Sequence, residues 1–164
     1  MKKLGILIMS VMLIAVGCQS GPEEESTTSE HTEHVNSLED VHELTASIET
    51  LPSFLSNHPD TIADIYARVP HYQDVIEHMP CYCGCGETAG HRSSYDCFIN
   101  IHNDDGSLVW DDHGAKCPVC LEIAYYSMEL HDRGASLEEI REFVDDRYQE
   151  GFAEPTNTPM PSDV

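Results

Sequence analysis

The chain has 164 residues, and its 30 acidic against 8 basic residues give a net charge of −22 at pH 7. This balance excludes nucleic acid as a partner, because a phosphate backbone requires a basic protein face. A chain of this length has room for one small domain once its terminal segments are set aside.

The first 17 residues are typical of a secretory signal peptide. Lys2 and Lys3 supply a positive start, residues 4–16 are mostly apolar, and small Gly17 precedes Cys18. The apolar run is shorter than the ~20 residues that a helix needs to cross a bilayer. We therefore predict that residues 1–17 are a signal peptide that is removed after export.

Ala15, Val16, Gly17 and Cys18 resemble the lipobox of bacterial lipoproteins. The resemblance implies that diacylglycerol is attached to the Cys18 thiol and that Cys18 becomes the first residue of the mature chain. Several acyl chains, such as palmitate, hold a protein on a membrane far longer than a single chain does. We expect a cell-membrane protein that is lipid-anchored on the extracytoplasmic face.

Polar segments flank the predicted domain. Residues 18–37 are rich in Ser, Thr, Glu and His, and they cannot bury enough apolar surface to offset the entropy of ordering, so we predict a flexible acidic tether. Residues 153–164 are polar and punctuated by proline, which predicts a disordered tail. The domain between them spans residues 38–152.

The N-terminal part of this domain has the sequence pattern of helices. The apolar pattern predicts helices over residues 38–55, 60–68 and 71–78, and Pro70 separates the last two. A hairpin follows, with strands at 98–101 and 108–110 around a turn that contains Asn, Asp and Gly.

Two longer helices close the domain. Pro118 begins a predicted helix over 118–132, and a capping box formed by Ser136 and Glu139 begins another over 137–149. We therefore predict a mainly α fold, a small single domain of about four to five helices with a Cys-rich irregular loop and one short β-hairpin.

Six cysteines remain after Cys18, all between positions 81 and 120. Three of them alternate in residues 81–85, and Gly84 and Gly86 let the chain fold around a centre. Cys117 and Cys120 lie at a predicted helix start, where the backbone amide groups stabilise thiolate. Thiolate is the form of cysteine that binds metal ions.

His91 and His113 lie in the same stretch, and soft metals such as zinc or copper(I) take mixed sulfur and imidazole ligands. The six thiols and two imidazoles offer eight donors, enough for two tetrahedral sites. We predict a metal-binding module without catalytic residues, because a closed sulfur-rich shell leaves no open position for a substrate. The predicted ligands are Cys81, Cys83, Cys85, His91, Cys97, His113, Cys117 and Cys120.

Asp111 and Asp112 directly precede His113. A carboxylate here could orient the imidazole of His113, as carboxylates often do for metal-binding histidines. An acidic pair in a turn is more often solvated, however, and we expect these side chains to face water.

Residues 80–85 read Pro-Cys-Tyr-Cys-Gly-Cys, and His91, Cys97 and the pair Cys117 and Cys120 follow. Over residues 60–150 this arrangement resembles the bacterial lipoproteins named after their PCYCGC motif. The resemblance implies export, lipidation and a shared domain. It implies no activity, because the family is described as uncharacterised.

Two alternatives to a metal site remain open. The oxidising cell exterior favours disulfides, which would make the chain a disulfide-stapled interaction domain with no metal. Cys117 and Cys120 also have the spacing of a thiol–disulfide oxidoreductase. A thioredoxin-like fold needs a parallel sheet beside such a motif, and the sequence contains no βαβ pattern.

Overall fold

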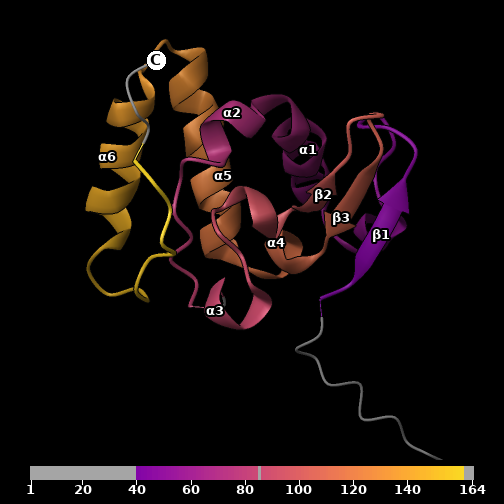
Figure 1. The fold of residues 1–164 in the computed structure, drawn as a ribbon, viewed down its shortest axis with the longest axis horizontal. Helices are drawn as coiled ribbons and strands as arrows, with labels where there is room; N and C mark the ends of the chain where they lie inside the picture. Colours follow the sequence, from indigo (N-terminus) through magenta and orange to yellow (C-terminus); the bar gives the residue numbers. More distant parts are fainter. Residues whose placement is uncertain (1–39, 85, 161–164) are drawn as a thin grey trace, which may run out of the picture. The chain divides into compact units, whose positions relative to one another are not determined.

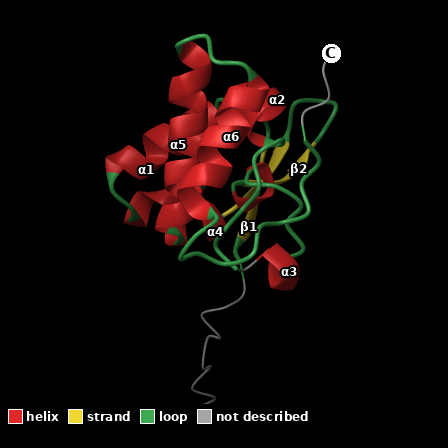
Figure 2. Cartoon of the chain, turned by 90° about the vertical axis from the view of Figure 1, so that its left-hand side faces the viewer, coloured by secondary structure: helices red, strands yellow, loops and turns green. Residues whose placement is uncertain are grey.

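A small sheet forms one end of the domain, and helices α5 (Pro118–Asp132) and α6 (Leu137–Tyr148) form the other (Figure 1). This arrangement is seen in a computed structural model that describes residues 40–84 and 86–160. In the view turned by 90°, the helices lie in front of the strands (Figure 2). The predicted signal peptide, Cys18 and the predicted tether lie outside the described residues.

Short elements complete the fold and confirm its predicted class. The remaining helices are α1 (Asp60–Arg68), α2 (Gln73–Ile76), α3 (Gly86–Ala89) and α4 (His113–Lys116), with 3-10 turns η1 (Ser53–Asn57), η2 (Val69–Tyr72) and η3 (Tyr95–Cys97). The strands are β1 (His42–Thr45), β2 (Ile99–His102) and β3 (Leu108–Asp111). The domain is mainly helical, as the sequence predicted. Within the described residues, no helix is long and apolar enough to span a membrane.

The two longest helices begin where the sequence predicted. Pro118 occupies the first turn of α5, where its missing N–H costs no hydrogen bond. At α6 the Ser136 side chain accepts a hydrogen bond from the backbone N–H of Glu139, and the Glu139 carboxylate accepts one from the backbone N–H of Ser136. Gly134, with a φ of 88°, ends the preceding turn.

The predicted helix over residues 38–55 is wrong. Strand β1 occupies part of this segment and pairs antiparallel with β3. The indole N–H of Trp110 also donates a 2.7 Å hydrogen bond to the hydroxyl of Thr45. Pairing partners more than 60 residues away decide this structure, so the local apolar pattern misled the prediction.

The hairpin prediction is confirmed, and β1 extends it into a three-stranded antiparallel sheet of order β1-β3-β2. The pairing of β2 with β3 shifts between Ile99 and Ile101. One consequence matters for the site: β3 ends at Asp111, immediately before the turn that leads into α4.

Helix α5 lies between two hydrophobic clusters. Cys120, Ala124 and Met128, four residues apart, pack into a core shared with the sheet and α1. Ile123, on a neighbouring face of α5, packs into a second core with residues of α6. Because α5 is buried on both sides, its first turn is held firmly, and the cysteine there is fixed in position.

The C-terminal segment lies along the loop that follows α2 (Figure 1). The Thr156 hydroxyl accepts a 2.9 Å hydrogen bond from the backbone N–H of Cys81, and the backbone N–H of Thr156 donates to the Cys81 carbonyl at 3.0 Å. The Thr158 hydroxyl donates to the carbonyl of Arg92 at 2.6 Å, and Arg141 donates to the carbonyl of Thr158. The prediction of a disordered tail over residues 153–164 did not anticipate these contacts.

Candidate metal centre

Three segments far apart in the sequence meet between the sheet and the first turn of α5. Cys81 lies in the loop after α2, Cys97 ends η3, and Cys120 lies in the first turn of α5. Each of these three residues is at most 1% exposed and belongs to the hydrophobic core. The packing of the core therefore brings the three thiols together.

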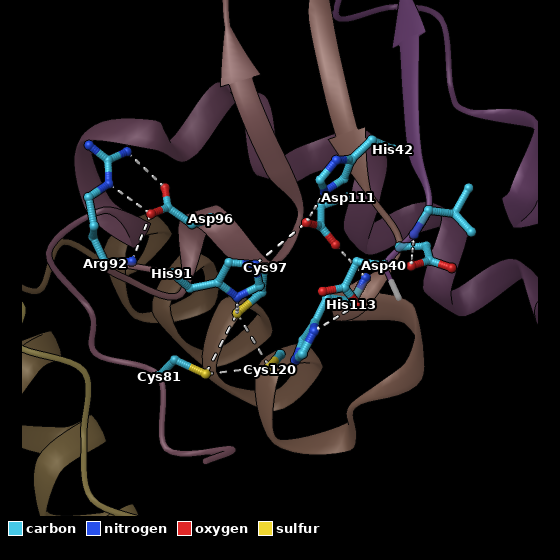
Figure 3. Close-up of polar contacts among 12 residues, drawn as sticks. Asp40, His42, Cys81, His91, Arg92, Asp96, Cys97, Asp111, His113 and Cys120 are labelled. Atoms are coloured by element: carbon cyan, nitrogen blue, oxygen red, sulfur yellow. Dashed lines mark hydrogen bonds and ion pairs between the residues drawn. The ribbon is translucent and has the colours of Figure 1, made fainter. Parts of the chain in front are cut away.

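The sulfur atoms of Cys81, Cys97 and Cys120 form a nearly equilateral triangle (Figure 3). The distance is 3.5 Å between Cys97 and Cys120, and it is 3.6 Å from Cys81 to each of the other two. A tetrahedral zinc ion about 2.3 Å from each sulfur requires sulfur atoms about 3.8 Å apart. A small outward movement of each thiol thus converts the triangle into one face of a metal–thiolate tetrahedron.

His91 supplies a nitrogen beside this triangle. Its Nδ1 lies 3.5 Å from the sulfur of Cys97, and 3% of its side chain is exposed. Its Nε2 lies 3.5 Å from Oδ2 of Asp111 and, within residues 40–84 and 86–160, is the one buried side-chain nitrogen or oxygen without a hydrogen bond. When Nδ1 of a neutral imidazole binds a metal, Nε2 carries the proton, and Asp111 lies where it can accept that proton's hydrogen bond.

A second group of donors lies closer to solvent. The thiol of Cys81 donates to the sulfur of Cys83 at 3.0 Å, and the sulfur of Cys83 lies 3.7 Å from Nε2 of His113. The thiol of Cys117 lies close enough to those of Cys83 and Cys120 to shift their pKa values. Cys83 and Cys117 are only half-buried, unlike the cysteines of the triangle.

In each of His91 and His113, a carboxylate lies near the ring nitrogen that faces away from the sulfur atoms. Nδ1 of His113 donates a 3.0 Å hydrogen bond to Asp40, which leaves Nε2 facing the thiols. Asp111 lies beside His91, accepts a 2.9 Å hydrogen bond from the ring of His42 and accepts another from the backbone N–H of His113. Metal-binding histidines are commonly held by such carboxylates, which fix the tautomer and the direction of the ring.

The thiols of the cluster share their protons unevenly. Hydrogen bonds with Cys117 and Cys120 lower the pKa of Cys83 to about 4, and those with Cys120 and Cys81 lower the pKa of Cys97 to about 7. The neighbouring thiols, Cys117 first, raise the pKa of Cys120. Thiolates this close repel one another, so all of them can ionise together only if a cation lies among them.

Neighbouring charged and polar groups shift the pKa values of His113 and of Asp111, the carboxylate beside His91. The sulfur of Cys83 raises the pKa of His113 to about 9; burial opposes this shift and Asp40 supports it. Burial disfavours the charged form of Asp111, but the nearby His91 imidazole and the hydrogen bonds from the His113 backbone and the His42 ring outweigh it and lower the pKa of Asp111. Each imidazole therefore lies between a sulfur atom and a carboxylate.

The structure gathers seven of the eight residues that the sequence proposed as ligands, and Cys85 lies outside the described residues. Besides the sulfur triangle, two groups of donor atoms among the described residues lie within 4.8 Å of one another, which is compact enough to hold a metal ion. The first consists of Cys81, Cys83 and Cys120, and the second of Asp40, His91, Asp111 and His113.

Sequence reasoning missed part of this surrounding shell. Asp111 is 1% exposed and Asp112 is 5% exposed, so the expectation of a solvated acidic turn is wrong. The sequence position of Asp111 did indicate a role in the site, since it lies two residues before the candidate ligand His113. Asp40 and His42 carried none, because the segment was assigned to a helix whose partners were unknown.

Two further contacts hold the turn that carries His113. The hydroxyl of Tyr66 donates to the carbonyl of Asp111 at 2.7 Å and accepts from the backbone N–H of Ala115 at 2.9 Å. A Cβ atom at Gly114 would lie 2.5 Å from the ring of Phe98, so only glycine allows α4 to approach this closely. The imidazole of His113 is thus positioned by residues on both sides of it.

The two alternative interpretations of the cysteines find no support in the described part of the chain. Among the described residues, Cys81, Cys97, Cys117 and Cys120 are free thiols. The sheet formed by the described residues is antiparallel throughout, whereas a thioredoxin-like site has its cysteine pair at the end of a strand in a parallel sheet.

Comparison with known proteins gives one match. The model of a family described as protein of unknown function with PCYCGC motif matches residues 6–161. No curated protein and no solved structure matches the chain. The chemistry of the cluster must therefore be derived from its own residues.

Proposed function

The chain belongs to the family of proteins of unknown function with the PCYCGC motif, and we propose that it is a membrane-anchored, extracytoplasmic lipoprotein that binds zinc or copper through its Cys/His cluster. The proposal concerns binding and not catalysis. A shell of thiolate and imidazole ligands that closes around an ion leaves no position for a substrate.

The observation that carries this proposal is the buried sulfur triangle of Cys81, Cys97 and Cys120, with Nδ1 of His91 beside it. Three sulfurs and one imidazole nitrogen are a donor set that structural zinc sites use. Soft thiolate ligands equally favour copper(I) over harder ions such as magnesium or calcium. The donor set therefore supports a soft ion and leaves zinc and copper(I) as the two candidates.

Electrostatics support the same proposal. Several thiols lie within 3.0–3.6 Å of one another, and the pKa values of Cys83 and Cys97 are lowered while that of Cys120 is raised. Without a cation, such a cluster keeps some protons because adjacent thiolates repel. A bound ion replaces those protons and removes the repulsion, so metal binding releases protons and stabilises the fold.

The ion also has a structural role in this proposal. Residues 77–84 and 90–98 contain little regular structure, yet they carry Cys81, His91 and Cys97. Small domains with limited cores often use a metal ion to cross-link such loops. A metal bound here would join both loops to the start of α5.

The lipid anchor rests on the sequence before the described residues. The lipobox-like residues end in Cys18, and the chain that follows is strongly acidic, with a net charge of −22 for the whole sequence. An acidic domain is repelled by an anionic membrane surface, so attachment through acyl chains suits it better than electrostatic adsorption.

Metal analysis of the full-length chain tests the binding proposal. The protein is purified without reducing agent or chelator, metals are quantified by inductively coupled plasma mass spectrometry, and free thiols are counted by mass spectrometry. We expect stoichiometric zinc or copper with unmodified thiols, and a lower metal content in Cys97→Ser but not in a control such as Ser56→Ala. Three disulfides with no metal would contradict the proposal.

Fractionation tests the anchor separately. Cys18→Ala should move the protein from the membrane fraction to the soluble extracytoplasmic fraction. Retention of this variant on the membrane would remove the lipid anchor from the proposal and leave the metal site untouched.

A further inference from the structure

The cluster contains more donors than one ion can use. The described residues supply five thiols and two imidazoles, whereas a tetrahedral ion takes four ligands. If the proposed function holds, Cys81, Cys97, Cys120 and His91 account for one ion. Cys83, Cys117 and His113 are then left beside it.

These three residues form a coherent second set. Nε2 of His113 lies 3.7 Å from the sulfur of Cys83, and Cys117, at the start of α5, lies close enough to Cys83 to influence its thiol. Asp40 holds Nδ1 of His113 and so directs Nε2 toward these sulfurs. A structural cysteine without a metal role has no need of an oriented imidazole in front of it.

The second set also touches the first through shared sulfurs. The sulfur of Cys81 lies 3.0 Å from that of Cys83, and Cys117 lies three residues before Cys120 at the start of α5. A thiolate has more than one lone pair and can bridge two soft ions. Cys81 or Cys120 can therefore complete a fourth position for an ion bound by Cys83, Cys117 and His113.

We propose that the chain holds two soft metal ions that share a bridging thiolate: a buried ion in the sulfur triangle, and an outer, exchangeable ion bound by Cys83, Cys117 and His113. This inference rests on the proposed function and deepens it.

The two ions differ in how a competing ligand can reach them. The triangle cysteines are at most 1% exposed, and the segment around Thr156 covers the Cys81 backbone. Cys83 and Cys117 are half-buried. Ligand exchange requires an incoming thiol or chelator to approach the ion, so the outer ion exchanges and the buried ion stays. The partner that this site fits is a soft-metal acceptor or donor with thiol ligands.

Titration of the reduced, full-length chain under anaerobic conditions tests the proposal. The metal-free protein is titrated in parallel with Zn²⁺ and with copper(I) in competition with a chromogenic chelator, and bound metal is counted after desalting. We expect two equivalents of at least one of these ions, with one equivalent removed rapidly by the chelator and one removed slowly.

Variants assign the two ions. Cys83→Ser and His113→Gln should each retain one slowly removed equivalent, and Cys97→Ser should lose the slow equivalent. His71→Gln is the matched control, because His71 is exposed and belongs to neither group of candidate ligands, and it should retain two equivalents. Circular dichroism of each variant checks that the fold persists, and Cys83 and His113 give two independent readouts.

The outcomes separate this inference from the proposed function. One equivalent in the unmodified chain, unchanged in both Cys83→Ser and His113→Gln, would overturn the second site and leave the buried site standing. No bound metal with either ion would overturn both.

Discussion

Nε2 of His113 lies 3.7 Å from Sγ of Cys83, although 30 residues separate them in the sequence. The histidine is held from its other nitrogen by Asp40, and the cysteine lies in a loop with no regular structure. This contact joins the sulfur cluster to the turn that follows β3. The ionisation of the Cys83 thiol can be tested directly.

Cys83 should react as a thiolate at acidic pH in the metal-free chain. Its pKa is lowered to about 4, chiefly by hydrogen bonds with Cys117 and Cys120, so between about pH 5 and about pH 8 it is deprotonated whereas an ordinary thiol is mostly neutral. At pH 6, iodoacetamide should therefore label Cys83 before the similarly half-buried Cys117, as measured by peptide mapping. A labelling rate at Cys83 that rises only above about pH 8 would contradict the lowered pKa.

Asp40→Asn should weaken binding of the outer ion by roughly 10–100-fold, the usual effect of losing a carboxylate that orients a metal-binding histidine. The hydrogen bond to Nδ1 of His113 persists in weaker form, but the negative charge that supports the imidazole is lost. Chelator competition measures the affinity. Asp104→Asn, at an exposed position of the hairpin turn, is the control and should bind metal as the unmodified chain does. Equal affinities in the two variants would show that Asp40 has no part in the site.

Tyr66→Phe should lower the free energy of unfolding of the metal-free chain by about 1–3 kcal/mol. The buried hydroxyl serves the carbonyl of Asp111 and the N–H of Ala115, and phenylalanine removes both hydrogen bonds. The N–H of Ala115 keeps its 3.1 Å hydrogen bond to the carbonyl of Asp112. Urea denaturation measures the change. Tyr125→Phe, at a residue that is 42% exposed, should change stability by only a few tenths of a kcal/mol. A loss in Tyr66→Phe no larger than this control would argue against the bridging role of the hydroxyl.

Thr156→Val should destabilise the loop that carries Cys81 by about 1 kcal/mol. Valine has nearly the shape of threonine but cannot accept the hydrogen bond from the backbone N–H of Cys81. Hydrogen exchange at the Cys81 amide should become faster, while exchange in α6 should not change. Thr61→Val, at an exposed position of α1, is the matched control. Unchanged protection of the Cys81 amide would mean that the C-terminal segment does not hold this loop.

Several helices could be predicted from local sequence because their signals are local. Residues 60–68 and 118–132 were predicted as helices with the bounds that the structure has, and the capping box at Ser136 marked the start of α6. Caps, proline positions and apolar spacing act within a turn or two of the chain. The short hairpin was also accessible, since its turn residues lie between its strands.

The chemical character of the site could likewise be predicted from the sequence. Thiols and imidazoles crowded between positions 81 and 120 indicated soft-metal chemistry, whatever their arrangement in space. Neither the separation into a buried triangle and a more exposed set, nor the carboxylates behind the histidines, could be predicted in this way. Both depend on which loops pack together.

Strand β1 shows why the tertiary structure decided the rest. Its hydrogen-bonding partners on β3 lie more than 60 residues away, and the pairing that overrules its helical pattern also places Asp40 and His42 beside the histidine and carboxylate of the 111–113 turn. The sequence by itself determined the ligands that the chain offers and the helices that surround them. Which ligands meet, and how deeply each is buried, was decided by long-range pairing and core packing, because such contacts have no signature within a local stretch of sequence.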